Sequence, residues 1–241
     1  MSSVWLIARR ELVATLRSPL GFVVATSVLL IDGLLFNVFA LGSGEKLSTE
    51  VITQFFWFLS GVTMIASVFI SMRLLAEERQ NGSITLLLTS PVKDYQVILG
   101  KFLGGYLYLA LLILITIYMP MLVLVNGKVS WGHLFSGYLG MLLLGAASFS
   151  IGIFGSSLSK SQIVAVVVSA AILVSMLLLW LASKIVDAPL KDIVKYLALH
   201  EMHFRAFMTG NIHLKHIVFY LSITTFFLFL ATRMLESRRW R

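Results

Sequence analysis

The residues with the clearest capacity for chemistry are four histidines and a glutamate in the last quarter of the chain. His200 and His203 are three residues apart, as are His213 and His216, and Glu201 lies within the first pair. This spacing places both members of a pair on one helix face, and imidazole is a common zinc ligand. Apolar residues alternate with the histidines and a glycine separates the pairs, which an amphipathic segment at a membrane surface also explains. We expect no metal site and keep the four histidines as its only candidate ligands.

Covalent catalysis and nucleotide hydrolysis have little support in the sequence. The chain has no Cys, which excludes thiolate catalysis and thiolate metal sites. It also lacks the Gly-x-x-x-x-Gly-Lys-Ser/Thr phosphate loop, because Gly100-Lys101 has no glycine at the required upstream position. The chain is therefore predicted not to be an enzyme and to bind no cofactor itself.

Asp32 is the only ionisable residue well inside an expected membrane span. It lies about 18 Å along a helix that starts near Leu20, past the middle of a bilayer. A carboxylate at that depth is costly and by default suggests a function. With Asn37 one to two turns further on, it could line a translocation pathway. The alternative is a structural carboxyl that reaches water or accepts hydrogen bonds from a neighbouring helix.

The elements that position these residues are predicted to be membrane-spanning helices. The chain is 59% hydrophobic and only 12% charged, which is more apolar surface than a water-exposed domain of 241 residues can cover. We predict an all-α fold, a polytopic membrane protein forming a single domain over residues 1–241. Six spans are expected, at 20–41, 51–72, 102–125, 134–158, 162–183 and 217–232.

The chain before the first span is predicted to form an amphipathic helix on the membrane surface, over residues 3–17. At about 100° per residue, one narrow face collects Trp5, Ala8, Leu12 and Leu16. Lys and Arg concentrate on the side that holds both termini, which the positive-inside rule assigns to the cytoplasm. These membrane-edge residues account for the formal charge of +8, so we expect contact with membrane lipid and not with nucleic acid.

Two further segments lie between spans. Residues 184–216, before the last span, form a polar extracytoplasmic loop with two short amphipathic pieces. Residues 73–101, between spans two and three, are longer than a helical hairpin needs. There a charged stretch is followed by Gly82 and a short apolar helix, Ser83–Thr89, which needs either a groove in a partner or the bilayer surface to cover it. Its apolar side chains are Ile84, Leu87 and Leu88.

The segment at 73–101 resembles the coupling segment of ABC-2-type permeases. The likeness lies in Glu-Glu-Arg-x-x-Gly-x-Ile-x-Leu-Leu-Leu-Thr-x-Pro-Val at 77–92, closed by Ile-Leu-Gly-Lys at 98–101. The sequence Leu-Glu-Ser-Arg-Arg-Trp at 235–240 resembles the gliding-motility-associated branch of that family. In topology the likeness covers the whole chain, with a surface helix, six spans and a long outer loop.

The resemblance implies a permease subunit of an exporter in the bacterial inner membrane. A separate cytoplasmic ATPase subunit would hold ATP and Mg and drive it, and a second copy of the permease would complete a homodimer. The gliding-motility branch further implies an extracytoplasmic accessory protein. The complex would then transport a substrate or transduce energy to that protein.

The resemblance also gives roles to individual residues. Glu77 and Glu78 would form coupling salt bridges with Arg9 or Arg10 of the surface helix; a solvated helix end is the alternative for these charges. The ATPase would dock on the coupling helix, at Gly82, Ser83, Ile84, Leu87, Leu88 and Thr89.

Two other functions stay open. A secondary transporter or channel usually carries several intramembrane charges or a pair of broken helices in matching halves. Asp32 alone is thin support for that class. A membrane-embedded enzyme acting on lipid needs polar residues clustered at one membrane depth, and only the histidine group approaches that.

Small residues also recur at the spacing of close helix contacts. Gly100 and Gly104 are four residues apart, as are Ser148, Gly152 and Ser156. We interpret both stripes as helix-packing surfaces and not as ligand sites.

Overall fold

The computed structural model describes residues 3–42, 47–82, 92–126, 129–187 and 190–239. These residues form helices and no β-strand. Six helical segments are long and apolar enough to cross a membrane: Pro19–Leu41, Ser48–Gln80, Asp94–Val125, Trp131–Leu158, Gln162–Ala182 and Leu214–Ser237. The predicted fold class, an all-α polytopic membrane protein, is confirmed. Each expected span overlaps one of the six, and several helices continue beyond the expected ends.

The first span follows a sharp corner. Helix α1 (Ser3–Arg17) ends one residue before α2 (Pro19–Leu35), and the Ser18 hydroxyl caps α2 by accepting a 2.9 Å hydrogen bond from the Gly21 amide. Pro19 in the first turn suits this start, because its missing N–H would be unpaired there anyway. The span ends in a π-helical turn, η1 (Phe36–Leu41), which the sequence pattern did not predict.

The second and third spans are each interrupted. Helix α3 (Ser48–Ser71) turns at Met72 into α4 (Arg73–Gln80). Helix α6 (Asp94–Ile115) is separated from α7 (Tyr118–Asn126) by a turn, because Pro120 cannot donate a hydrogen bond back to the carbonyl of Thr116.

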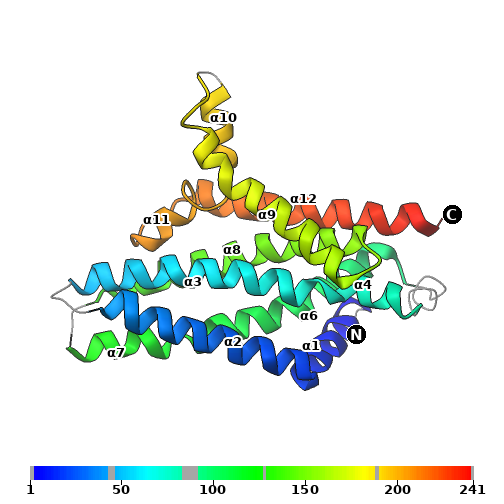
Figure 1. Ribbon diagram of the computed structural model, residues 1–241, viewed down its shortest axis with the longest axis horizontal. Helices are drawn as coiled ribbons and strands as arrows, with labels where there is room; N and C mark the ends of the chain where they lie inside the picture. The colour runs from blue at the N-terminus through cyan, green and yellow to red at the C-terminus, as the bar shows by residue number, and fades with distance from the viewer. Residues whose placement is uncertain (1–2, 43–46, 83–91, 127–128, 188–189, 240–241) are drawn as a thin grey trace.

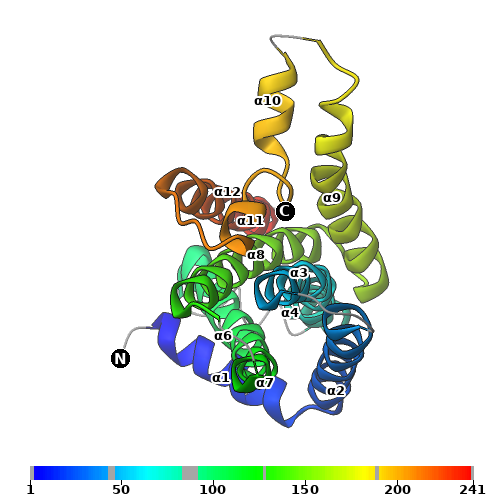
Figure 2. The ribbon, with the colours of Figure 1, turned by 90° about the vertical axis from the view of Figure 1, so that its left-hand side faces the viewer.

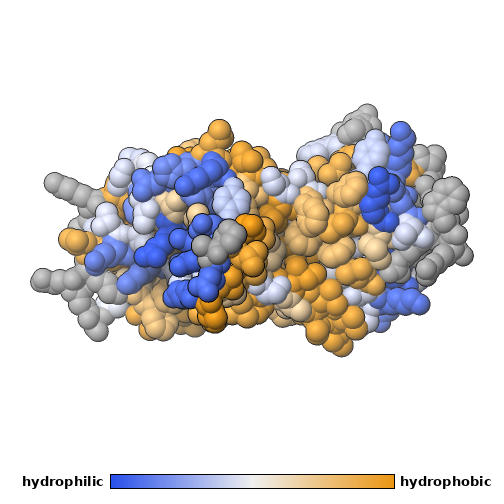
Figure 3. Space-filling view, turned by 90° about the horizontal axis from the view of Figure 1, so that it is seen from above, coloured by the Kyte–Doolittle hydropathy of each residue, from blue (hydrophilic) through white to orange (hydrophobic). Residues whose placement is uncertain are grey.

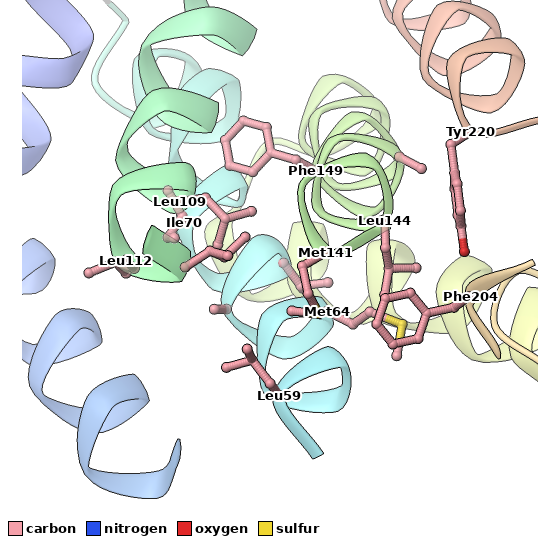
Figure 4. Close-up of a cluster of buried hydrophobic side chains, with 14 of the residues drawn as sticks. Leu59, Met64, Ile70, Leu109, Leu112, Met141, Leu144, Phe149, Phe204 and Tyr220 are labelled. Carbon is pink, nitrogen blue, oxygen red and sulfur yellow. The ribbon is translucent and has the colours of Figure 1, made fainter. Parts of the chain in front are cut away.

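Helix α8 (Trp131–Leu158) is the centre of the bundle. Most of it is buried, and core side chains from α3, α6 and α12 (Leu214–Arg239) converge on it (Figure 4). Met141, Leu144 and Phe149 of α8 are completely buried. Helix α9 (Gln162–Ala182) packs back on α8 after a tight connection, but most of α9 and α2 faces outward, as lipid-exposed helices do.

The polar stretch before the last span forms two short helices, α10 (Leu190–Leu197) and α11 (Phe204–Met208). Helix α10 stands out from the bundle beside the end of α9, and α11 lies against α8 (Figures 1 and 2). The opposite end of the bundle holds α1, α4 and the end of α12, so both ends of the chain lie on one side (Figure 1).

A band of apolar side chains separates two more polar ends on the face that carries α9, α10 and α12 (Figure 3). The band runs across the long axis of the molecule, as expected for helices that cross a lipid layer roughly parallel to one another. The end with α1 and α4 is called the inner end below, and the end with α11 the outer end.

Candidate functional site

A buried lysine joins three helices at the inner end. Lys101, in the second turn of α6, is only 1% exposed, and its Nζ donates hydrogen bonds to Glu11 Oε1 of α1 at 2.8 Å and to Glu78 Oε1 of α4 at 2.7 Å. Arg10 Nη2 lies 3.7 Å from the same two oxygens, at the rim. We call Arg10, Glu11, Glu78 and Lys101 the inner charge cluster.

The close approach of α1 to α6 depends on two glycines. A Cβ atom at Gly104 would lie 2.6 Å from the Ala8 carbonyl oxygen, and one at Gly100 would lie 2.7 Å from Ile7 Cβ. Both positions therefore require Gly for this close helix contact. This agrees with the interpretation of the Gly100–Gly104 stripe as a helix-packing surface. The contact brings Glu11 within reach of Lys101, which directly follows Gly100 and lies about one turn before Gly104.

The turn between α3 and α4 is held by Ser156 of α8. Its Oγ donates to the Met72 carbonyl at 2.8 Å and accepts from the amides of Leu75 and Ala76 at 3.1 and 3.0 Å. Gly152, one turn earlier in α8, lies against Ser71, where a Cβ atom would clash with the hydroxyl. The second small-residue stripe thus packs on the α3–α4 turn and orients α4.

Two arginines bind α4 to its surroundings. Arg73 donates to Ser18 Oγ at 3.1 Å and to Thr15 Oγ1 at 2.9 Å, which joins the start of α4 to the corner between α1 and α2. Arg79 donates to the Ser159 carbonyl at 3.0 Å, beyond the end of α8. A cavity of about 440 Å³ lies beside these contacts. Its charged lining residues are Arg10, Glu11, Arg73, Glu77, Glu78 and Lys101.

The structure separates the residues expected to form the coupling salt bridges. Glu78 lies near Arg10, whereas no ion pair among the described residues includes Glu77 or Arg9. Glu77 is half-buried in the cavity wall, and Arg9 is exposed. Gly82 follows α4 with a φ of 70°, a conformation that favours glycine. The other expected docking residues, Ser83, Ile84, Leu87, Leu88 and Thr89, lie outside the described residues.

The comparisons with known proteins match this architecture. A family model described as "ABC-2 family transporter protein" matches residues 32–239, which include five complete spans and the second half of the first. The chain belongs to the ABC-2 transporter family. Proteins of this family are typically the non-catalytic membrane component of a transporter, and the family implies an ATPase partner in general. A search of the curated proteins finds no match.

In this ABC-2 family chain, Asp32 is buried within the bundle. It is 3% exposed, and neither carboxyl oxygen has a hydrogen-bond partner in the described part of the chain. Tyr138 of α8 is among the groups near the carboxyl. Asn37 is exposed on the π-helical turn, so the two residues proposed to line a pathway face different surroundings.

The outer histidines of the ABC-2 chain pair across the sequence and not within each predicted pair. His203 Nδ1 lies 2.8 Å from His216 Nδ1, and His203 Nε2 lies 2.8 Å from the Tyr196 carbonyl oxygen. His200 Nε2 lies 2.8 Å from Ser60 Oγ on α3. Within the described ranges, no group of three His, Cys, Asp or Glu side chains is placed to hold a metal ion.

Burial sets the protonation of this histidine group. Desolvation is the largest cause that lowers the pKa of His203; nearby Lys215 lowers it further, and the hydrogen bond to Tyr196 opposes both. Burial also lowers the pKa of His200, against a smaller opposite effect of Glu201. Both side chains are therefore neutral at neutral pH.

The sequence interpretation missed Glu11 and Lys101 as partners of Glu78. A signal was present, because Lys101 stands between glycine and phenylalanine in an otherwise apolar helix and a buried ammonium needs an anionic partner. The missing information was the position of α1, which only the packing on Gly100 and Gly104 supplies.

Proposed function

We propose that this chain is the membrane subunit of an exporter driven by a separate cytoplasmic ATPase, and that the inner charge cluster passes motion of the ATPase into the spans. ATP and Mg would be held by the ATPase. The observation that carries the proposal is the pair of short hydrogen bonds by which Lys101 holds α1 and α4 together.

The chain connectivity supports this route. Helix α4 continues the second span at the inner end and leads through Gly82 into the expected docking residues at 83–89. A displacement of that segment would act on α4, and α4 is joined to α1 by Lys101 and to α8 by Ser156. Because buried charge pairs tolerate little separation, α1, α4 and α6 would move together.

The arrangement in the membrane is part of the same proposal. The basic residues of the inner end favour a cytoplasmic location for both termini, in the bacterial inner membrane. Two copies of the chain would form the pathway, in contact through part of the apolar surface that α2 and α9 expose. The tail at 235–240 supports the gliding-motility-associated branch, with an extracytoplasmic accessory protein at the outer end.

The test is affinity purification of the full chain from native membranes in mild detergent, with mass spectrometry and an ATPase assay. A stoichiometric ATPase with a phosphate-binding loop is expected. Leu87→Asp combined with Leu88→Asp should release it, because these side chains share a face of the expected coupling helix. Leu86→Asp is the matched control, since position 86 falls on the opposite face and its variant should retain the ATPase.

A second variant separates docking from coupling. Lys101→Met should leave the ATPase bound to the membrane subunit. The rate of ATP hydrolysis by the bound ATPase should then no longer depend on the conformation of the membrane subunit. If the chain purifies alone, or with an ATPase that tolerates the Leu87 and Leu88 changes, the proposal is wrong. Transport that stops on collapse of the proton gradient while ATP stays constant would instead favour a secondary transporter.

A further inference from the structure

Asp32 is a buried carboxyl in the first span with no partner for either oxygen among the described residues. An ionised carboxylate in such a place loses its hydration and gains no hydrogen bond or counter-charge, which costs far more than burying a neutral acid. The proposed ATPase coupling makes no use of this residue.

Among the described residues, no cation is hydrogen-bonded to Asp32 or lies within ion-pair distance of it. The charged side chains of α1, α3 and α6, the helices that pack on α2, form no ion pair with Asp32 in the described part of the chain. They are Arg9, Arg10, Glu11 and Arg17 in α1, Glu50 in α3, and Asp94 and Lys101 in α6. Helix α8 contributes Tyr138, and His133 of α8 is bonded to the Met208 carbonyl at the outer end.

The hydrogen bonds beyond Tyr138 have a fixed direction. Thr116 Oγ1 donates its single hydrogen to the Ile113 carbonyl at 2.6 Å. Thr116 Oγ1 can therefore only accept from the Tyr138 hydroxyl, which lies 3.2 Å away. Tyr138 has then used its own hydrogen, and its oxygen offers Asp32 only an acceptor. A protonated Asp32 suits this environment, and an ionised one does not.

We propose that Asp32 is a proton-binding site, occupied while α2 packs in the bundle and released when the packing of α2 on α3 opens to water. The π-helical turn supports such a movement, because it begins one turn after Asp32. There the Phe36 amide is shared between the carbonyls of Asp32 and Gly33. Turns of this kind are irregular points in a helix and occur frequently at functional sites. The proposal goes beyond the ATPase-driven permease function and does not depend on it.

The test is infrared spectroscopy of the full chain, labelled with ¹³C at the aspartate carboxyl and reconstituted in vesicles of neutral phospholipid. At pH 7, we expect a C=O stretching band of a protonated carboxylic acid that shifts with the isotope label. Asp32→Asn should remove this band. Glu50→Gln is the control, because Glu50 is exposed at the start of α3, so its variant should keep the band.

The wild-type spectrum remains decisive if Asp32→Asn does not fold. The chain has four aspartates, and Asp94 is the other buried one, so Asp94→Asn assigns the band by elimination. Carboxylate bands alone at pH 7 would overturn the proposal. So would an acid band that disappears when Na⁺ or K⁺ replaces choline, because the site would then bind a metal cation in place of a proton. Neither result would bear on the ATPase partnership, which the experiment does not involve.

Discussion

The helices at the inner and outer ends of this molecule are held together by different polar interactions, charged at one end and neutral at the other. At the inner end, Lys101 is fully buried between the carboxylates of Glu11 and Glu78. At the outer end, His203 and His216 are equally buried, but they meet as a neutral pair with Nδ1 atoms 2.8 Å apart. The inner end depends on full charges, and the outer end depends on their absence.

The hydrogen bonds of the outer pair define how it must be protonated. The Tyr196 carbonyl can only accept, so His203 carries its hydrogen on Nε2 and its Nδ1 accepts from His216 Nδ1–H. A second proton on His203 would place two N–H groups against each other. The ring of His203 is also stacked on Phe219 with centroids 3.6 Å apart, so it has little room to turn away.

The largest effect should follow from removing the inner cation. Lys101→Met keeps the length of the side chain but leaves Glu11 and Glu78 facing each other without a counter-charge. We expect the free energy of unfolding, measured by SDS titration in mixed micelles, to fall by about 3–5 kcal/mol. Lys160→Met, at an exposed lysine, is the control and should change it by less than about 0.5 kcal/mol. Equal effects in the two variants would remove the contrast between buried and exposed charge.

The next effect should distinguish two neighbouring glutamates. Glu78→Gln preserves shape but replaces a charged acceptor of Lys101, and we expect a loss of about 1–3 kcal/mol. Glu77→Gln should be nearly neutral, because Glu77 lines the cavity and forms no ion pair among the described residues. Thermal unfolding of both variants, together with ATPase stimulation in the complex, would show the difference. A larger effect of Glu77→Gln than of Glu78→Gln would mean that the contact that couples α4 to α1 does not involve Lys101.

The comparison also shows which features the sequence pattern predicts. Six spans, the helix at 3–17 and the short helices before the last span follow from hydropathy and periodicity, which are local properties. The partners of Glu78 and of His203 do not, because they come from helices far apart in the chain. The spacing of the histidines suggested pairs at 200–203 and 213–216, but the tertiary fold joins His203 to His216 and His200 to Ser60.

Mild acid should loosen the outer end and leave the inner end unchanged. The pKa of His203 is below its ordinary value of 6.5 in the folded chain, so the unfolded chain binds more protons. Its contribution to stability is complete above pH 6.5 and is lost as the pH falls below that value. We expect hydrogen-exchange protection of residues 200–213 to decrease on lowering the pH from 7.5 to 5, with protection of α4 unchanged. His213→Gln is the control, because His213 is exposed and its variant should keep the same pH dependence.

The smallest effect is expected at an ion pair of the outer end that is exposed. Glu201 Oε2 lies 3.8 Å from Arg205 Nη1, and the arginine side chain is 72% exposed. Water screens both charges and the long side chains lose entropy when they pair, so Glu201→Gln should change the free energy of unfolding by less than about 0.5 kcal/mol. The same titration in mixed micelles measures it beside Lys101→Met. A loss of free energy comparable to that of Lys101→Met would mean that an ion pair also stabilises the outer end. The neutral histidine pair would then not be the main interaction that stabilises that end.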